Sequence, residues 1–111
     1  MPSYKAAIEH IKDARRGDYF ERVFNITGLS LTGKSAKCQV KAEVDSESLL
    51  EFSTTATTIV ISGSSLTIKC DADLFTLPTG LDIYDIEIFT NVHDVATIIE
   101  GTFEVVDQTT K

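Results

Sequence analysis

The sequence predicts an all-β protein, a sandwich of two packed antiparallel sheets with about seven strands. Two observations support this fold class. Short runs of alternating apolar and polar residues recur along the chain, separated by turns at spacings of roughly 8–12 residues. No substantial helical pattern follows residue 17. An up-and-down barrel, which also consists of short antiparallel strands, is the alternative architecture.

The stretch Leu77–Phe89, LPTGLDIYDIEIF, predicts the central strand. Pro78 and Gly80 suit a turn, because proline restricts φ and glycine accepts positive φ. The run that follows alternates with period two and is rich in β-branched and aromatic residues. Its tyrosine is similar to the tyrosine corner of immunoglobulin-like folds, so we expect an immunoglobulin-like sandwich. The expected inward set is Tyr84, Ile86 and Ile88, and the expected outward set is Asp85, Glu87 and Phe89.

The same alternation predicts the other strands. It is clearest in residues 36–44, which read as one buried and one wet face of an antiparallel strand. Gly101 in the last apolar run predicts a bulge or bend. Asp71 and Asp73 suit the N-cap of a single helical turn over Ala72–Leu77. The inward set of the clearest strand is Ala36, Cys38, Val40, Ala42 and Val44, and the seven expected strands cover residues 18–27, 36–44, 49–52, 59–61, 66–70, 81–89 and 95–106.

The N-terminal segment has a different pattern, and we assign residues 1–17 to an arm and residues 18–111 to the sandwich domain. Ser3 suits a helix N-cap and Gly17 a C-terminal stop. Ile8, Ile11 and Ala14 repeat at a spacing of three, which predicts a short helix with one thin apolar stripe. An extended, strand-like arm is the alternative. The segment either lies along its own domain or docks on a neighbouring subunit.

Length and composition indicate one globular domain. The chain has 111 residues, and 42% of them are hydrophobic. No apolar run approaches the ~20 residues needed to span a bilayer, so no membrane association is expected. The N-terminus has no apolar signal region, so we expect folding in the cytoplasm. In that reducing compartment, Cys38 and Cys70 are expected to be buried free thiols rather than a disulfide.

The charge excludes most nucleic-acid binders. Seventeen acidic and ten basic residues give a net charge of −7. The only local basic cluster is Lys12, Arg15 and Arg16, and Asp13 and Asp18 flank it. A protein that binds DNA or RNA must neutralise phosphates with clustered cations, so no nucleic-acid partner is expected.

A search for reactive clusters predicts no catalytic, cofactor or metal site. His10 and His93 have no cysteine or aspartate at metal-ligand spacing. Asp71, Asp73 and Asp82 lack the glycine and distal glutamate of a calcium loop. No nucleophile elbow, phosphate-binding loop or dinucleotide-binding motif occurs. The chain is therefore expected not to be an enzyme.

From about Arg16 onward, the order of motifs resembles small immunoglobulin-like proteins among the virion structural proteins of tailed bacteriophages. The motifs are R-G-D-Y-F, L-T-G, the alternating strand 36–44, L-P-T-G, Y-D-I-E-I and I-I-E-G-T-F-E-V-V. Related sandwich modules occur in tail, baseplate and fibre-attachment proteins and as capsid decoration. The resemblance implies a non-enzymatic virion component, made in the host cytoplasm and assembled in many copies. Its implied partners are copies of itself and other virion proteins.

A protein of this kind contacts its neighbours through an arm or strand edges. For each expected contact residue the alternative is burial within its own domain. The alternative function is a carbohydrate- or receptor-binding sandwich, which needs exposed aromatic residues at one loop end; the loops 62–65 and 91–94 contain none. The expected partner-contact residues are Tyr4, Ile8, Ile11, Arg15 and Arg16 of the arm and the outward-facing Tyr19, Val23 and Phe89.

Overall fold

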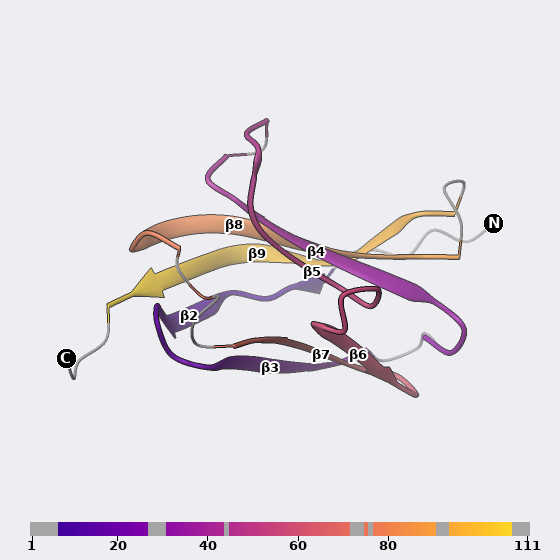
Figure 1. Ribbon diagram of the computed structural model, residues 1–111. Coiled ribbons are helices and arrows are strands. Elements are labelled where there is room, and N and C mark those ends of the chain that lie inside the picture. The colour runs from indigo at the N-terminus through magenta and orange to yellow at the C-terminus, as the bar shows by residue number, and fades with distance from the viewer. Residues whose placement is uncertain are drawn as a thin grey trace.

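The computed structural model describes residues 7–26, 31–43, 45–71, 75, 77–90 and 94–107. Within these ranges the chain forms nine β-strands and no helix. Two sheets pack face to face in a sandwich-like arrangement, so the predicted all-β class is confirmed (Figure 1). Because the strands form two separate sheets, the alternative of one closed barrel is wrong.

Each of the seven predicted strands overlaps one of the strands β3 to β9. Two further strands, β1 and β2, come from the N-terminal segment, so the predicted number was too low. The bounds are β1 (Ala7–Ile8), β2 (Ile11–Arg15), β3 (Phe20–Asn25), β4 (Ser35–Lys41), β5 (Ser48–Ser53), β6 (Ile59–Ser62), β7 (Ser65–Cys70), β8 (Gly80–Phe89) and β9 (Ala96–Val106).

The larger sheet, called sheet A, has six strands in the order β1-β9-β8-β4-β5, and β2 also pairs with β9. Strand β8 lies between β9 and β4 and pairs antiparallel with both, which confirms the predicted central strand. Strands β1 and β2 run parallel to β9. Sheet A is therefore mixed, whereas the sequence had predicted purely antiparallel sheets.

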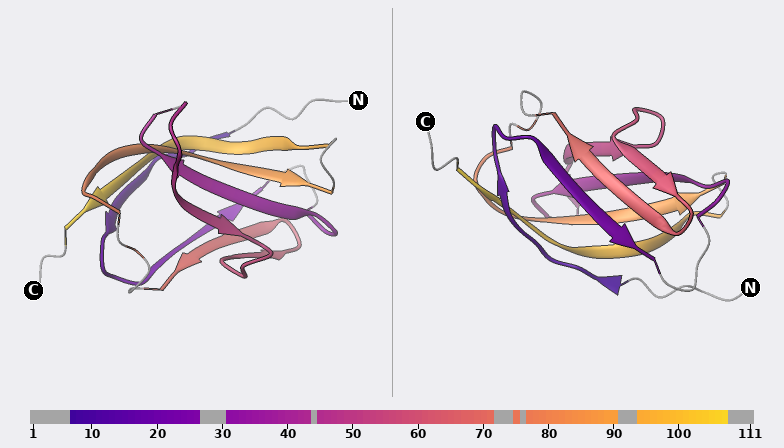
Figure 2. Two further views of the ribbon diagram at one scale, coloured as in Figure 1. Left: turned by 45° about the horizontal axis from the view of Figure 1, so that its top comes forward. Right: turned by 90° about the horizontal axis from the view of Figure 1, so that it is seen from below.

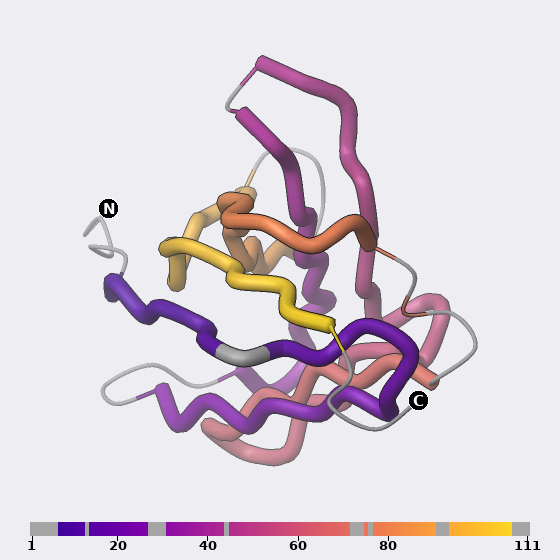
Figure 3. The backbone as a smooth tube through the Cα atoms, turned by 90° about the vertical axis from the view of Figure 1, so that its left-hand side faces the viewer, coloured from indigo at the N-terminus to yellow at the C-terminus, as the bar shows by residue number. Residues whose placement is uncertain are grey.

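The smaller sheet, called sheet B, has three antiparallel strands in the order β3-β7-β6. It covers one face of sheet A, as the view from below shows (Figure 2, right). The β4–β5 hairpin extends beyond the region that sheet B covers (Figure 3). Ala42 in this hairpin is accordingly exposed, although its alternation had placed it in the core, and Val44 lies outside the described residues.

The core lies between the two sheets and is built around aromatic rings. Phe103 of β9 packs against Phe20 of β3, Phe75 and Tyr84 of β8, with ring centroids 5.4–6.2 Å apart. Tyr84, Ile86 and Ile88 all face inward, as predicted. Cys38 and Cys70 are buried free thiols, also as predicted. The rest of the predicted inward set of β4, Ala36 and Val40, is buried too.

The predicted N-terminal helix is wrong for the described part of the segment, residues 7–17. Ile11 pairs with Phe103 and Ala14 with Val105, so β2 has one residue more than β9 between these pairs. This bulge turns residues three apart onto the same face of the strand, and both Ile11 and Ala14 are buried. A bulged strand thus reproduces the spacing of three that we had read as helical.

The bulge predicted at Gly101 occurs elsewhere in β9. The pairing between β8 and β9 shifts between Ile86 and Glu87, which leaves Ile98 as the extra residue. Gly101 serves a different purpose, because a Cβ atom there would overlap the carbonyl oxygen of Glu9. A helical turn was also predicted over Ala72–Leu77. Most of that segment, residues 72–74 and 76, lies outside the described residues.

Candidate functional site

The outer face of sheet B carries a small apolar patch with little charge. Val23 of β3 pairs with Thr67 of β7, and Thr67 pairs with Val60 of β6, so these three residues form one row across the sheet. Val23 is 50% exposed and Val60 is 45% exposed. Tyr19, just before β3, is 54% exposed.

The face also carries two residues of opposite charge. Glu21 of β3 lies directly opposite Lys69 of β7. The hydroxyl of Tyr19 donates a hydrogen bond of 2.7 Å to Glu21 Oε1. That hydrogen bond, together with the charge of Glu21, raises the pKa of Tyr19. Around Val23 and Val60 the face therefore presents apolar side chains beside one pair of opposite charges, whereas Asp71 adds a further negative charge near Tyr19.

Strand β3 forms one edge of sheet B, and its outer edge pairs with no strand in the described part of the chain. Two hollows lie between β3 and the N-terminal strands of sheet A. Figure 3 shows β2 alongside β3 in this region. One, of about 500 Å³, is lined by Ala7, Glu9, Ile99 and residues 22–26. The other, of about 250 Å³, is lined by residues of β2 and β3, and we call the two together the side groove.

Arg22 lines both hollows of the side groove. By alternation it belongs with the buried Phe20 and Phe24, yet it is exposed. No hydrogen bond or ion pair joins its guanidinium to another residue in the ranges that the structure describes. An arginine in this position offers five donors to a carboxylate, a carbonyl or an aromatic ring of a partner.

Among the edge strands described, β3 is the least protected against pairing with another chain. Proteins shield sheet edges with very short strands or with bulges. Strand β1 has two residues and β6 has four. Strand β2 is bulged between Ile11 and Ala14, and β5 is bulged at Leu49, the extra residue opposite Val40 and Lys41. Strand β3 has six residues in unbroken register with β7.

The outer face of sheet A differs, because it is lined with charges. Glu100, Asp85, Gln39 and Glu51 form one row across β9, β8, β4 and β5. Burial and the nearby Glu87 raise the pKa of Asp85, whereas Lys41 opposes this effect. A shallow groove of about 410 Å³ crosses this face, and its lining includes polar residues from β4, β8 and β9, His10 and the exposed Ile8.

The N-terminal segment is held against β9 by buried and polar contacts. The Tyr84 hydroxyl donates a hydrogen bond of 2.6 Å to the carbonyl oxygen of Glu9. Burial is the main cause that raises the pKa of this phenol. The Thr102 amide donates to His10 Nδ1 at 3.2 Å, and the Thr102 hydroxyl lies 2.8 Å from the same nitrogen. The described residues 7–16 are thus part of sheet A.

The structure separates the contact residues expected on the arm. Ile11 is 1% exposed and packs in the core, so its expected role in a partner contact is wrong. Ile8 is 67% exposed and lines the groove of sheet A. Arg15 and Arg16 are exposed at the end of β2, and Arg15 Nη1 donates to the Asp107 carbonyl at 3.4 Å. Tyr4 lies outside the described residues.

Of the expected contacts beyond the arm, Tyr19 and Val23 are both exposed and lie along the same side of the β3 segment, with the charged Glu21 between them. Phe89 lies apart from them, half-buried on the outward side of β8 in sheet A. Sequence reasoning missed Arg22 and Val60. Both had a signal: Arg22 interrupts the apolar alternation of β3, and Val60 is the outward residue between Ile59 and Ile61.

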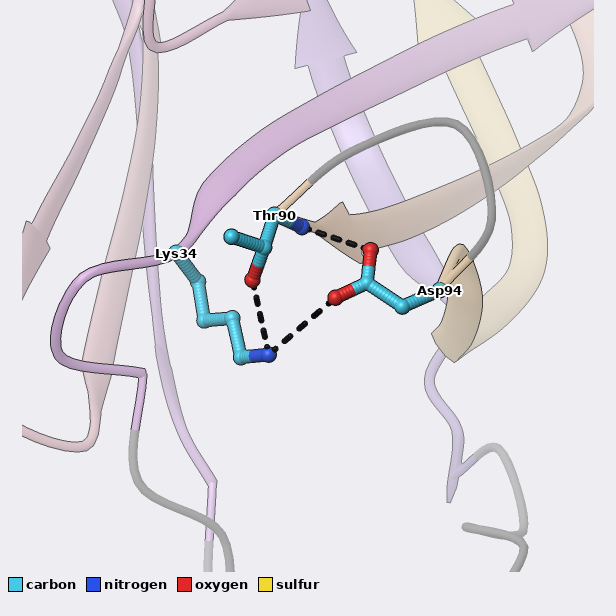
Figure 4. Close-up of polar contacts among 3 residues, drawn as sticks. All are labelled: Lys34, Thr90 and Asp94. Atoms are coloured by element: carbon cyan, nitrogen blue, oxygen red, sulfur yellow. Dashed lines mark hydrogen bonds and ion pairs between the residues drawn. The ribbon is translucent and has the colours of Figure 1, made fainter.

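The remaining polar clusters have structural roles. The Lys34 ammonium donates to the Thr90 hydroxyl at 3.0 Å and lies 3.6 Å from Asp94 Oδ2, while the Thr90 amide donates to Asp94 Oδ1 at 2.7 Å (Figure 4). This cluster ties the start of β4 to the end of β8 and the start of β9. His93 and Asp73 lie outside the described residues.

Within the described ranges, no group of three histidine, cysteine or acidic side chains is placed to hold a metal ion. Among the described residues there is no helix that could cross a bilayer. No protein-family model matches this chain, and no curated protein matches its sequence.

Proposed function

We propose that this protein is a non-enzymatic structural component of a tailed-bacteriophage virion that assembles in many copies on the tail, the baseplate or the head. The observation that carries the proposal is β3, a six-residue strand in regular register with an unprotected edge. It lies beside a groove over the core, and its outer face carries the exposed Val23 in one row with Thr67 and Val60. Such an edge suits docking by β-strand addition.

The strand order supports an immunoglobulin-like topology, which is part of this proposal. If β3 to β9 are taken as strands B, C, C′, D, E, F and G, sheet A has the order G-F-C-C′ and sheet B has the order B-E-D. Variable-type immunoglobulin domains group their strands in the same way. Strand A of that topology lies beside strand B, and no described strand takes this place beside β3.

The charge of the chain supports the same choice of surface. Copies with a net charge of −7 repel one another, and this repulsion is weakest where the approaching surfaces are neutral. The part of sheet B around Val23 comes nearest to this condition, because Glu21 and Lys69, of opposite charge, lie opposite one another in the next row. An acidic protein also avoids packaged nucleic acid, which agrees with a place on the outside of a particle, reached after synthesis in the host cytoplasm.

Sedimentation velocity and mass photometry of the purified chain test the proposal. We expect a defined oligomer whose population rises with protein concentration. Val23→Asp should weaken the association, because it places a charge on the docking surface, whereas Leu81→Asp on the outward side of β8 should leave it unchanged. Leu81 is the matched control because it is 65% exposed. A chain that stays monomeric and does not associate with virion proteins would overturn the proposal.

The groove on sheet A favours a second candidate, a carbohydrate- or receptor-binding module. Gln39, Lys41, Asp85 and Thr102 line it and offer both donors and acceptors to sugar hydroxyls. This candidate ranks lower, because the only aromatic residue in the lining, Tyr84, is buried. Binding of the purified chain to a glycan array, lost in Lys41→Ala and kept in Lys69→Ala on sheet B, would favour it over assembly.

A further inference from the structure

We infer that β3 pairs antiparallel with β3 of a second copy, about a two-fold axis at Val23, so that two copies of sheet B join into one six-stranded sheet. The inference rests on the proposed function in assuming that copies of the chain associate, and it adds the interface and its register. Both copies use the same edge about a two-fold axis, so this contact produces a closed dimer.

The free edge of β3 has its backbone groups available at the required positions. In an antiparallel sheet, the amide and carbonyl of one residue point to the same neighbour, and successive residues alternate between the two neighbours. The Ile26 amide donates to the Ser64 carbonyl at 2.8 Å, on the β7 side. Glu21, Val23 and Asn25 are of the opposite parity, so their amides and carbonyls point to the free edge.

The charges of β3 exclude two registers of such a pair. A two-fold axis perpendicular to the sheet places one residue of the strand opposite itself, and like charges directly opposite are destabilising. An axis at Glu21 or at Arg22 would place two like charges face to face. An axis at Val23 places Val23 against Val23 and avoids both contacts.

The same axis gives the other β3 residues compatible partners. Glu21 lies opposite Asn25 of the second copy, an amide that can donate to its carboxylate. Arg22 lies opposite Phe24 of the second copy, whose ring is 7% exposed, so the aliphatic stem of the arginine can pack beside that side chain. Both arginines would then fill the side groove, which they already line. The strand is therefore complementary to itself in this register.

Disulfide trapping with the full chain tests the register. In Val23→Cys, the two introduced thiols would lie on residues about 5.5 Å apart between Cα atoms, within the range that a disulfide bridges. The control is Val60→Cys, which is about as exposed on the same face but lies on β6 at the far edge of sheet B. Its two copies would be roughly 24 Å apart, or five strand spacings.

The native thiols do not interfere, because Cys38 is 0% and Cys70 is 5% exposed. We expect Val23→Cys to form a disulfide-linked dimer under mild oxidation at least tenfold faster than Val60→Cys. Circular dichroism checks that both variants keep the strand content of the parent chain. Equal rates in the two variants would overturn the β3 interface.

The experiments distinguish failure of the β3 interface from failure of the proposed function. If the parent chain sediments as an oligomer and Val23→Cys does not cross-link faster than its control, the copies associate through another surface, and only the β3 interface is overturned. If the parent chain is monomeric, does not associate with virion proteins and cross-links equally at both positions, both are overturned. Faster cross-linking at position 23 supports the interface in either sedimentation result.

Discussion

The two sheets of this sandwich differ in how they treat their edges and their outer faces. Sheet A ends in a bulged strand on each side, and its outer face carries one mainly acidic row, Glu100, Asp85, Gln39 and Glu51. Sheet B ends in the regular strand β3, and its outer face is apolar and neutral around Val23 and Val60. Both sheets have alternating sequences, so alternation alone does not distinguish them.

This difference teaches which half of the molecule maintains the fold and which half is available to a partner. Sheet A contains the central strand, the N-terminal strands and most of the polar contacts that hold the chain together. Sheet B closes the core with three strands, and in the described part of the chain no strand pairs with the outer edge of β3. Four substitutions, given from the largest expected effect to the smallest, test this division.

Phe103→Ala should have the largest effect, because it removes the ring that joins the two sheets. Phe103 is fully buried and packs on rings from both of them. Truncation of a buried phenylalanine costs about 3–5 kcal/mol. Urea denaturation should show this loss, whereas Val60→Ala on the outer face of sheet B should change stability by about 0.5 kcal/mol or less. Similar losses in the two variants would contradict the shared core.

Gly101→Ala should loosen the N-terminal edge of sheet A. The new methyl group would overlap the Glu9 carbonyl, and overpacking of this kind costs about 1–3 kcal/mol. Amide hydrogen exchange of residues 7–16 should become faster. Gly63→Ala is the control, because its Cβ would meet nothing within 4 Å and its cost would come only from a φ of +61°. Unchanged exchange in residues 7–16 would show that β9 does not need a glycine at this position.

Tyr84→Phe should cost about 1 kcal/mol at neutral pH, since it removes one buried hydrogen-bond donor to Glu9. The folded state raises the pKa of this phenol, so its contribution is complete below the unfolded pKa of 10.0 and is lost at higher pH. Denaturation curves above about pH 10 should therefore show a smaller gap between parent and variant than at neutral pH. Tyr19→Phe, with an exposed hydroxyl, is the control and should cost less.

Asp85→Asn should have the smallest effect, a gain of at most about 0.5 kcal/mol at neutral pH. Burial raises the pKa of this carboxyl, so the stability it contributes in the protonated form is lost as pH rises through the folded pKa. Asparagine does not ionise, so the variant avoids this loss of stability. The difference in free energy of unfolding between variant and parent should therefore vanish below about pH 4. Glu51→Gln, exposed in the same row, is the control. A destabilised Asp85→Asn variant would show that this carboxylate supports sheet A.

Much of the fold could be predicted from local patterns. The strands β4 and β8 alternate strictly, and their inward residues from Ala36 to Val40 and from Tyr84 to Ile88 are buried as expected. The helix predicted around Ile11 and Ala14 failed because a bulged strand and a helix share a spacing of three. The choice between them depended on β9, a strand that lies far away in the sequence.

The candidate site was less predictable than the fold. Tyr19 and Val23 were expected at a partner contact, and both are exposed along the same side of the β3 segment, but Phe89 is on the other sheet and Ile11 is in the core. Alternation states which residues share a side of one strand. It does not state which strands lie next to each other, so the row of Val23, Thr67 and Val60 could not be assembled from the sequence.

By itself, the sequence determined that this chain forms strands, where most of them lie and which of their faces is apolar, because these properties depend on the period-two pattern of neighbouring residues. Only the tertiary structure decided that the N-terminal segment joins sheet A, that Gly101 must lack a side chain and that β3 keeps a free edge. Each of these depends on contacts between segments distant in the chain, which no local pattern encodes.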